Sequence, residues 1–370
     1  MRIFKFTFAA MLAMAVALTS CKKDDPSGDS HTPIKMMLAD SCHVNISGII
    51  KAKRYFTYNA YGLPIETRRV KAEGGSFVND TLIKRGFDKH RNLLFEERYV
   101  WKNDFWNTVS KREYTYNEND SVMTLVTYKG NGDVSGWSAS EKYEYDYDKS
   151  GVLIKHNQYV HMSGDKFQLR YSLKAFLDAE TGLCAFATES SYDNNDVETP
   201  LRRTEYTRYD DGKVKSENVS VYRDNVWEAY CMSEFAYDAN GNKTQEIGSI
   251  YNKGTNKYDK DLEISCSYTS DSKLTKYERK CKFDGESVWT VALLVENDYN
   301  AAGKIVKYHY EAVGGKFRDD FILSLVKSID CTYKYDNAGC LIEEAFDYNS
   351  GFDTGFNKGV NEYFNSEHVF

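Results

Sequence analysis

The sequence predicts an all-β protein, an antiparallel meander of about twenty strands built from about ten two-strand repeats of about 30 residues. Three observations predict it: a turn phrase that recurs at near-constant spacing, a second turn series halfway between its copies, and alternation of aromatic and polar residues between turns. Composition agrees, because 29 Tyr and 20 Phe against 4 Pro favour strands that use aromatic side chains to fill a half-buried face.

The recurring phrase is an aromatic residue, Asp or Asn, two or three small or polar residues, and Gly. Segments 147–151 (YDKSG) and 237–241 (YDANG) are clear copies. Asn, Asp and Gly tolerate the left-handed backbone that a hairpin turn needs, so each copy predicts a hairpin. The predicted turn positions lie about 30 residues apart, at residues 62, 91, 120, 151, 182, 212, 241, 272, 303 and 339.

A second turn, rich in Gly, Asn and Asp and usually followed by an aromatic residue, lies near the middle of each unit. Two turns per unit mean two strands per unit, each of roughly eight to eleven residues. Between turns the period is two, as in 143–147, where Tyr alternates with Glu and Asp. The second-series positions are Phe77, Trp106, Trp137, Phe167, Val197, Trp227, Tyr258, Trp289 and Phe317.

We expect a single β-repeat domain over residues 34–370, with repeats over about 55–350. An open sheet of this length twists, so the expected shape is a superhelical ribbon or solenoid-like strip. A membrane-spanning barrel is not expected, because a lipid-facing strand needs one continuous apolar face. Segment 111–116 instead offers Tyr and Arg on one side and Lys, Glu and Thr on the other.

The first 20 residues read as a secretory signal peptide, with Arg2 and Lys5 before an apolar run that ends at Leu18. Residues 18–21 (LTSC) resemble the lipobox of bacterial lipoproteins. The resemblance implies cleavage before Cys21 and acylation of that cysteine, including a palmitate-type chain, which would anchor the protein on a membrane. An ordinary signal peptide with a chance cysteine is the alternative.

Residues 21–33 form a flexible tether, because their Lys, Asp, Pro, Gly and Ser side chains bury nothing. Lys22, Lys23, Asp24 and Asp25 resemble the surface-export signal of Bacteroidota lipoproteins. That resemblance implies an outer-membrane location with the protein facing the cell exterior. An anchor that faces the periplasm is the alternative.

The repeat itself resembles the YD repeat of RHS-type bacterial surface and toxin-shell proteins. The residues that carry the resemblance lie at 145–151, 235–241 and 333–339, and it covers about 55–350. It implies hairpins wound into a strip. The longer unit, the added Trp turn and the lack of a toxin or self-cleaving C-terminal domain depart from that family, so toxin encapsulation is not implied.

No motif for catalysis, cofactor or metal is evident. The 7 His residues lack metal-ligand spacing, and phosphate-loop, nucleophile-elbow and dinucleotide motifs do not occur. Segment 238–242 resembles a calcium loop but lacks its final acidic ligand, so turn chemistry explains it better. A carboxylate pair for glycosidic chemistry stays open among the 55 acids.

Charge argues against nucleic acid as a partner. The formal net charge is −7, and removal of residues 1–20 makes it more negative because that segment carries two basic residues and no acid. Lysines are interleaved with acids along the chain, so no basic stripe for a phosphate backbone exists.

The cysteines other than Cys21 are expected to be mostly free thiols. In the predicted register Cys266 opposes residue 274 or 275, and Cys340 opposes Tyr335, which leaves Cys281 and Cys331 too distant for bridges.

Trp106, Trp137, Trp227 and Trp289 are the candidate ligand-binding residues, since regularly spaced aromatic faces can stack on sugars or apolar peptide groups. The same pattern suits a buried stack of aromatic rings, which we favour, with Trp137 the exception because it follows an open loop. Thr81 and Ser121 lie in Asp-Thr/Ser-apolar triplets that resemble the acceptor of Bacteroidota O-glycosylation.

We therefore expect a non-catalytic surface lipoprotein that contacts a membrane through its lipid and binds a glycan or protein ligand along an extended β surface. A structural or adhesive scaffold without a small ligand is the alternative. An enzyme with an unrecognised site is the third hypothesis.

Overall fold

The computed structural model describes residues 35–133, 136–164, 166–282, 289–312, 326–350 and 358–369, whose regular secondary structure is all β-strand. No helix among these residues is long and apolar enough to cross a membrane. The strands are β1 (Lys35–Ile46), β2 (Ile49–Tyr58), β3 (Pro64–Glu73), β4 (Ser76–Phe87), β5 (Leu93–Lys102), β6 (Phe105–Tyr116), β7 (Val122–Gly130), β8 (Trp137–Tyr147), β9 (Leu153–Ser163), β10 (Lys166–Leu177), β11 (Cys184–Tyr192), β12 (Glu198–Arg208), β13 (Val214–Arg223), β14 (Val226–Tyr237), β15 (Lys243–Asn252), β16 (Lys257–Tyr268), β17 (Leu274–Cys281), β18 (Thr290–Tyr299), β19 (Ile305–Ala312), β20 (Val326–Tyr335), β21 (Leu341–Ser350) and β22 (Lys358–Val369).

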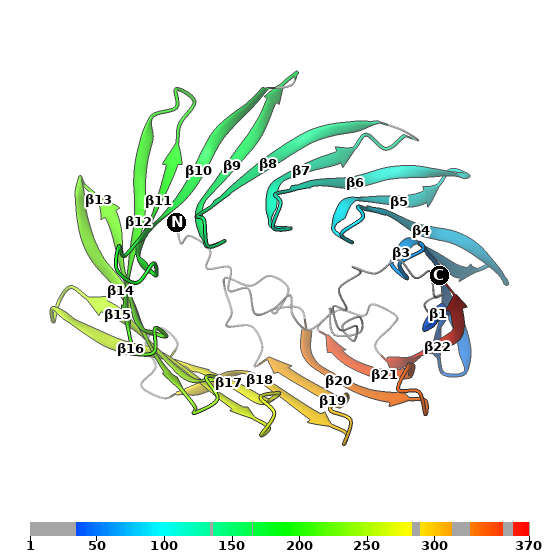
Figure 1. The fold of residues 1–370 in the computed structure, drawn as a ribbon. Coiled ribbons are helices and arrows are strands. Elements are labelled where there is room, and N and C mark those ends of the chain that lie inside the picture. Colours follow the sequence, from blue (N-terminus) through cyan, green and yellow to red (C-terminus); the bar gives the residue numbers. More distant parts are fainter. Residues whose placement is uncertain are drawn as a thin grey trace, which may run out of the picture.

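The strands form one 22-stranded antiparallel sheet in which each strand pairs with its sequence neighbours. The predicted all-β meander of two-strand repeats is thereby confirmed. The predicted open ribbon is wrong, because β1 also pairs with β22 over ten residue pairs, from Lys35 with Val369 to Asn45 with Val360, and closes the sheet into a barrel (Figure 1). Closure pairs the two free edges that an open meander would expose.

The turns explain why the meander forms. All ten predicted turn positions have positive φ, including the non-glycine residues Arg91, Asp120 and Ser272. The residue after the aromatic supplies the side-chain acceptor: Asp148 Oδ1 accepts the backbone N–H of Ser150 at 2.9 Å and of Val152 at 2.8 Å. These turns follow every even-numbered strand from β2 to β20, so they share one end of the barrel, here the Tyr-Asp rim.

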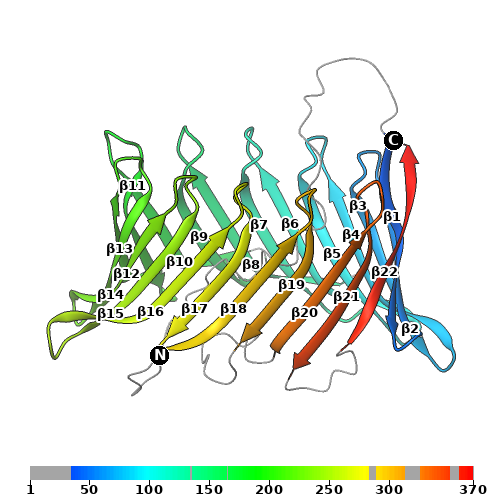
Figure 2. The ribbon, with the colours of Figure 1, turned by 90° about the horizontal axis from the view of Figure 1, so that it is seen from below.

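The hairpins at the opposite rim follow odd-numbered strands, and several of them use tighter turns. The two-residue turns Asn103-Asp104 and Asp224-Asn225 have positive φ throughout, which is the type I′ geometry that matches strand twist. Near this rim each even-numbered strand from β4 to β18 holds a β-bulge. In β6, for example, Ser110 pairs with Arg98 and Thr108 with Tyr99, so Val109 is left over. Bulges bend and twist strands, and Figure 2 shows inclined, curved strands.

The backbone register decides which side chains face the inside. At the first Tyr-Asp turn, Asn59 donates its N–H to the Leu63 carbonyl and accepts the Gly62 N–H, so its backbone groups point toward β3 and those of Tyr58 point toward β1. The strands follow one another counterclockwise in Figure 1, and Figure 2 places the Tyr-Asp rim on the side that faces the viewer of Figure 1. For L-residues this arrangement puts the Tyr58 side chain inside the barrel.

The cross-strand pairs extend this assignment around the wall. The inner face is rich in tyrosine, and beside the closure it carries a buried cluster of Val44, Ala52, Cys331 and Phe346 from β1, β2, β20 and β21. The packing of this cluster stabilises the barrel next to its closing strand pair.

The outer face carries alternating charges joined by ion pairs. Lys142–Glu144 at 2.6 Å, Lys111–Glu113 at 2.9 Å and Lys280–Glu278 at 2.8 Å are examples. A bilayer-spanning barrel needs a continuous outward apolar band, and these rows of charge interrupt one. The outer face of the barrel therefore has the mixture of charged and polar side chains that the sequence predicted for these strands. The expectation that the sheet stays open was wrong.

Candidate functional site

Aromatic rings form an outward-facing band at the rim opposite the Tyr-Asp turns. We call them the rim aromatics: Phe77, Trp101, Trp106, Trp137, Phe167, Tyr222, Trp227, Tyr251 and Tyr258. Trp106 lies directly across from Trp101, and Trp227 from Tyr222. Ring centroids in these two pairs are 5.1 Å apart with interplanar angles of 72° and 62°. Such edge-to-face pairs add to hairpin stability beyond the area they bury.

The rim aromatics do not form the buried stack expected from the sequence. Trp227 is 40% exposed and Phe77 is 43% exposed, whereas Trp106, Trp137 and Trp289 are half-buried. Equivalent rings in successive hairpins are two strands, or about 10 Å, apart, so most pair within their own hairpin. The expectation that Trp137 is the exposed exception was also wrong, because its ring meets Tyr99 of the preceding hairpin at 5.9 Å.

Polar side chains fix the turns that carry these rings. Buried Asn107 donates from Nδ2 to the carbonyl oxygens of Lys102 at 2.9 Å and Phe105 at 3.1 Å, which fixes the loop next to Trp106. In another hairpin of the same rim Asn252 donates to Asp259 at 2.7 Å, on the exposed surface. The register places Asn107, Asn252 and Asp259 on the face opposite to Trp106 and Tyr251, so these groups position the turns and do not flank the outward rings.

The two candidate O-glycosylation residues, Thr81 and Ser121, lie in different parts of the barrel. Thr81 is half-buried on the inner face, across from Arg69 and Val100. Ser121 lies at the Tyr-Asp rim, where its N–H donates to Asn117 Oδ1 at 2.9 Å. Cys21, the 22–25 segment and Phe317 fall outside the described residues.

The seven cysteines within the described residues are all free, as predicted. The register behind that prediction was wrong by two or three residues, because Cys266 pairs with Tyr277 and Cys281 with Leu262. Cys340 lies in a turn, where its N–H donates to Asp336 Oδ1 at 2.7 Å. Burial raises the pKa of the Cys42 thiol to about 11, so this group stays protonated at neutral pH.

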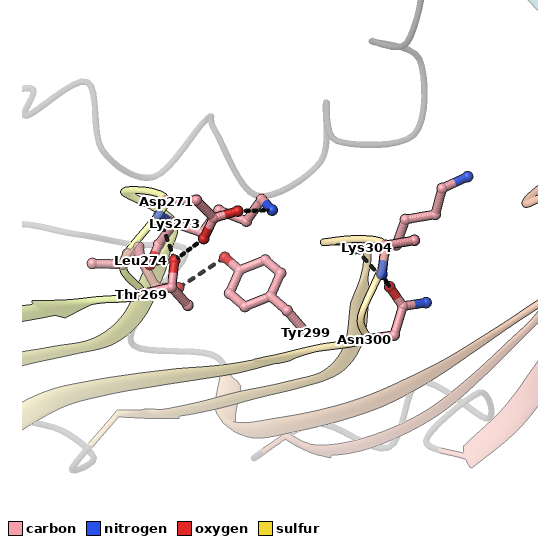
Figure 3. Close-up of polar contacts among 8 residues, drawn as sticks. Thr269, Asp271, Lys273, Leu274, Tyr299, Asn300 and Lys304 are labelled. Carbon is pink, nitrogen blue, oxygen red and sulfur yellow. Dashed lines mark hydrogen bonds and ion pairs between the residues drawn. The ribbon is translucent and has the colours of Figure 1, made fainter.

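The repeat tyrosine has a role that the sequence pattern did not reveal. Figure 3 shows the Tyr299 hydroxyl, which donates to the Leu274 carbonyl at 2.8 Å and so links the turn at Thr269 to the turn at Asn300. We call these bonds the tyrosine links. They join Tyr58 to Ala39, Tyr116 to Leu93, Tyr147 to Val122, Tyr237 to Val214, Tyr268 to Lys243, Tyr299 to Leu274 and Tyr335 to Ile305.

Where a repeat lacks this tyrosine, the link changes. Arg208 takes the equivalent place and donates from Nη2 to the Cys184 carbonyl at 2.9 Å. The regular occurrence of Tyr before Asp was the sequence signal for these bonds, but the carbonyl that each hydroxyl reaches depends on strand pairing.

His309 has two acidic partners, Asp330 on the neighbouring strand and Glu311 on its own strand. His309 Nδ1 lies 2.7 Å from Asp330 Oδ1, and its Nε2 lies 3.9 Å from Glu311 Oε2, all on the outer face of β19 and β20. No sequence pattern indicated the Asp330 contact, because it depends on the β19–β20 register. Among the described residues no group of three or more His, Cys, Asp or Glu is arranged to hold a metal ion.

Two shallow hollows mark the surface. One, of about 390 Å³, lies at the Tyr-Asp rim beside His90 and Tyr116. The other, of about 480 Å³, lies along β17–β20 beside His309. Neither of these two hollows is lined by a rim aromatic.

The fold and these surfaces define a closed antiparallel barrel of tyrosine-linked hairpins with a charged outer wall. No family model matches the chain, and no curated protein matches it. A Bacteroides fragilis protein of unknown function is similar at 13% identity over 33% of this chain and 91% of its own, with a TM-score of 0.29. The TcdB2-TccC3 structure is similar at 11% identity over 84% of this chain and 20% of its own, with a TM-score of 0.33. A porin-like protein from Bacteroides uniformis is similar at 11% identity over 69% of this chain and 94% of its own, with a TM-score of 0.32.

Proposed function

We propose that this protein is a non-catalytic, lipid-anchored surface protein that binds glycans through its rim aromatics. The observation that carries the proposal is the outward Trp227–Tyr222 pair, in which Trp227 is 40% exposed beside a polar turn. A half-exposed indole offers a flat apolar face to the CH groups of a sugar ring.

Repetition supports a glycan more than a compact ligand. Comparable aromatic pairs recur at Trp101–Trp106 and Tyr251–Tyr258 in other hairpins. A polymer with repeated sugar units can contact several such pairs at once, so weak single contacts add up to useful affinity.

The test uses the soluble protein beginning after residue 33 on a glycan and extracellular-matrix array. Trp106→Ala combined with Trp227→Ala should abolish retention on a positive glycan and lower the melting temperature only modestly, because each ring packs mainly on one neighbouring ring at the rim. Tyr55→Ala, which removes a 37% exposed outer-face ring nearer the Tyr-Asp rim, is the matched control and should keep binding. Equal retention by the double variant and the wild type contradicts the proposal, and binding to matrix proteins alone favours the scaffold alternative.

The anchor is tested separately. Cys21→Ala should move the full-length protein from the detergent phase to the aqueous phase, because it removes the acylated residue. Replacement of Asp24 and Asp25 should protect the protein from protease added to intact cells. A Cys21→Ala protein that still partitions with detergent contradicts the lipoprotein assignment.

A further inference from the structure

Five arginines line the inner face of five consecutive strands, β2 to β6, which lie side by side in the wall (Figures 1 and 2). Arg54 opposes Arg69 directly, and Glu96 has Arg85 on one side and Arg112 on the other. We call this set the arginine wall. At a strand spacing of about 4.8 Å it spans about 19 Å. Its members are Arg54, Arg69, Arg85, Arg98 and Arg112.

The carboxylates on this wall neutralise only part of its charge. Arg69 pairs with Asp80. Buried Glu96 accepts hydrogen bonds from Arg85 Nε and from Arg98 Nε, each at 2.9 Å. The charged wall is thus fixed in place by a buried carboxylate.

In the part of the chain that the structure describes, two guanidinium groups, those of Arg54 and Arg112, are left for a ligand, together with the unpaired N–H groups of the others. The Arg98 side chain is 52% exposed, Arg112 is exposed, and neither Arg112 nor Arg54 forms an ion pair with a described residue. The Arg69 Nε is buried and has no hydrogen-bond partner among the described residues. A positive surface on a concave wall concentrates the potential and attracts anions into the barrel.

The chemistry of this surface selects the kind of anion. Planar guanidinium groups bind carboxylate and sulfate groups through paired hydrogen bonds. Tyr114 and Phe56, on the same inner face, add rings that can stack on sugar CH groups. An acidic peptide suits the wall less well, because every strand of the closed sheet is already paired on both sides and offers no edge for strand addition.

We propose that the arginine wall binds an acidic oligosaccharide, one that bears carboxylate or sulfate groups, inside the barrel. This site is separate from the rim aromatics on the outer face and does not depend on their proposed function.

The experiment measures binding by calorimetry with size-defined polygalacturonate and heparin oligosaccharides, neutral dextran oligosaccharides and a poly-glutamate peptide. The test variant carries Arg54→Gln, Arg98→Gln and Arg112→Gln. The matched control carries Lys53→Gln, Arg68→Gln and Lys84→Gln, which removes the same charge from the outer face of β2, β3 and β4. We expect the wild type to bind an acidic oligosaccharide, the inner triple variant to lose at least tenfold in affinity, and the outer triple variant to stay within twofold of wild type.

Equal losses in the two triple variants would overturn the proposal, since they would show attraction by net charge alone. An unaffected inner variant, no binding of either acidic oligosaccharide, or tighter binding of poly-glutamate would overturn it as well. If the triple variant fails to fold, Arg112→Gln alone is used, because Arg112 is exposed and forms no ion pair with a described residue. This single variant should still weaken binding severalfold. Unchanged affinity would contradict the proposal. Loss of neutral glycan binding at the rim would leave this result untouched, so the two proposals fail independently.

Discussion

Single residues stabilise this barrel mainly at its turns, through side chains that satisfy backbone groups. The tyrosine hydroxyls satisfy carbonyls at the starts of strands, and the Asp or Asn that follows each aromatic accepts N–H groups inside the turn. Burial raises the pKa of Tyr299, which keeps its hydroxyl protonated as a donor. The repeat phrase thus encodes two different hydrogen-bond functions in adjacent residues.

Removal of one tyrosine link should have a modest, measurable cost. Tyr299→Phe deletes the bond to the Leu274 carbonyl and leaves the ring in place. We expect the free energy of unfolding to fall by about 1 kcal/mol, the usual net value of such a bond. Chemical denaturation measures it, with Tyr61→Phe, an exposed turn tyrosine, as the control that should change nothing. Equal stability of both variants would show that the link does not contribute.

The turn aspartates should make the barrel sensitive to acid. Hydrogen bonds from Ser150 lower the pKa of Asp148, and those from Asn242 lower the pKa of Asp238. A folded pKa below the unfolded value of about 3.9 means that the stabilisation is complete above that value and is lost as pH falls through the folded pKa.

Replacement of the turn aspartates should reduce this sensitivity. Asn already serves at residues 59, 117 and 300, so Asp148→Asn with Asp238→Asn keeps the acceptor and removes the titrating group. Melting temperatures between pH 5 and pH 2.5, a range set by the reference value of about 3.9, should fall less in the double variant than in wild type. Parallel curves would contradict this account.

Hairpins are the elements that the sequence specifies most directly. At the Tyr-Asp rim a side-chain acceptor and one residue of positive φ reverse the chain, and at the opposite rim two-residue type I′ turns do so after β1, β3, β5 and β13. The bulge near the opposite rim then bends each even-numbered strand. Because every hairpin repeats the same bend, the sheet curves consistently toward its tyrosine face.

The positive φ at each turn should destabilise any residue there that carries a Cβ, and this effect can be measured. A Cβ on Gly151, at φ +83°, would meet no atom within 4 Å, so Gly151→Ala isolates the backbone effect. We expect a loss of about 1–2 kcal/mol in the free energy of unfolding, the cost of a left-handed conformation for a residue with a Cβ. Lys149→Ala in the same turn is the control and should cost little, and an equally stable Gly151→Ala protein would argue against this turn geometry.

At the scale of the whole molecule, closure joins the two ends of the chain. Cys42 of β1 lies directly opposite Tyr363 of β22 on the inner face. The apolar cluster next to this closing pair supports it with side chains from β20 and β21. In the closed ring each repeat is hydrogen-bonded to a neighbouring repeat on both sides.

A cross-link can report closure directly. Tyr363→Cys places a thiol across from Cys42, and a directly opposed cross-strand pair brings the Cβ atoms within about 4.5–5.5 Å, within reach of a disulfide after slight adjustment. Oxidation at alkaline pH, where part of the buried Cys42 thiol is ionised, should join the introduced thiol to Cys42 within the monomer, which peptide mass mapping detects. Val295→Cys, on the inner face of β18, should form no bridge with Cys42. Failure of the Tyr363→Cys variant to cross-link would indicate an open sheet in solution.

The strands, the turns and their period could be predicted from the sequence alone. These features are local: a turn depends on four or five neighbouring residues, and a strand face depends on alternation, so the ten turn positions were predicted correctly. The N-terminal lipobox is equally local and stays a prediction.

Closure, the exposure of the tryptophans and the arginine wall emerged only with the strands assembled in space. Closure depends on an edge pairing between β1 and β22, which are separated by almost the whole chain, and no local pattern encodes it. The five arginines come from β2 to β6 and share a face only through cross-strand register. A register shift of one residue moves a side chain to the other face of the sheet. The register predicted at the cysteines was wrong by two or three residues. A site whose residues share a face only through the register of several strand pairs therefore could not be predicted from the sequence.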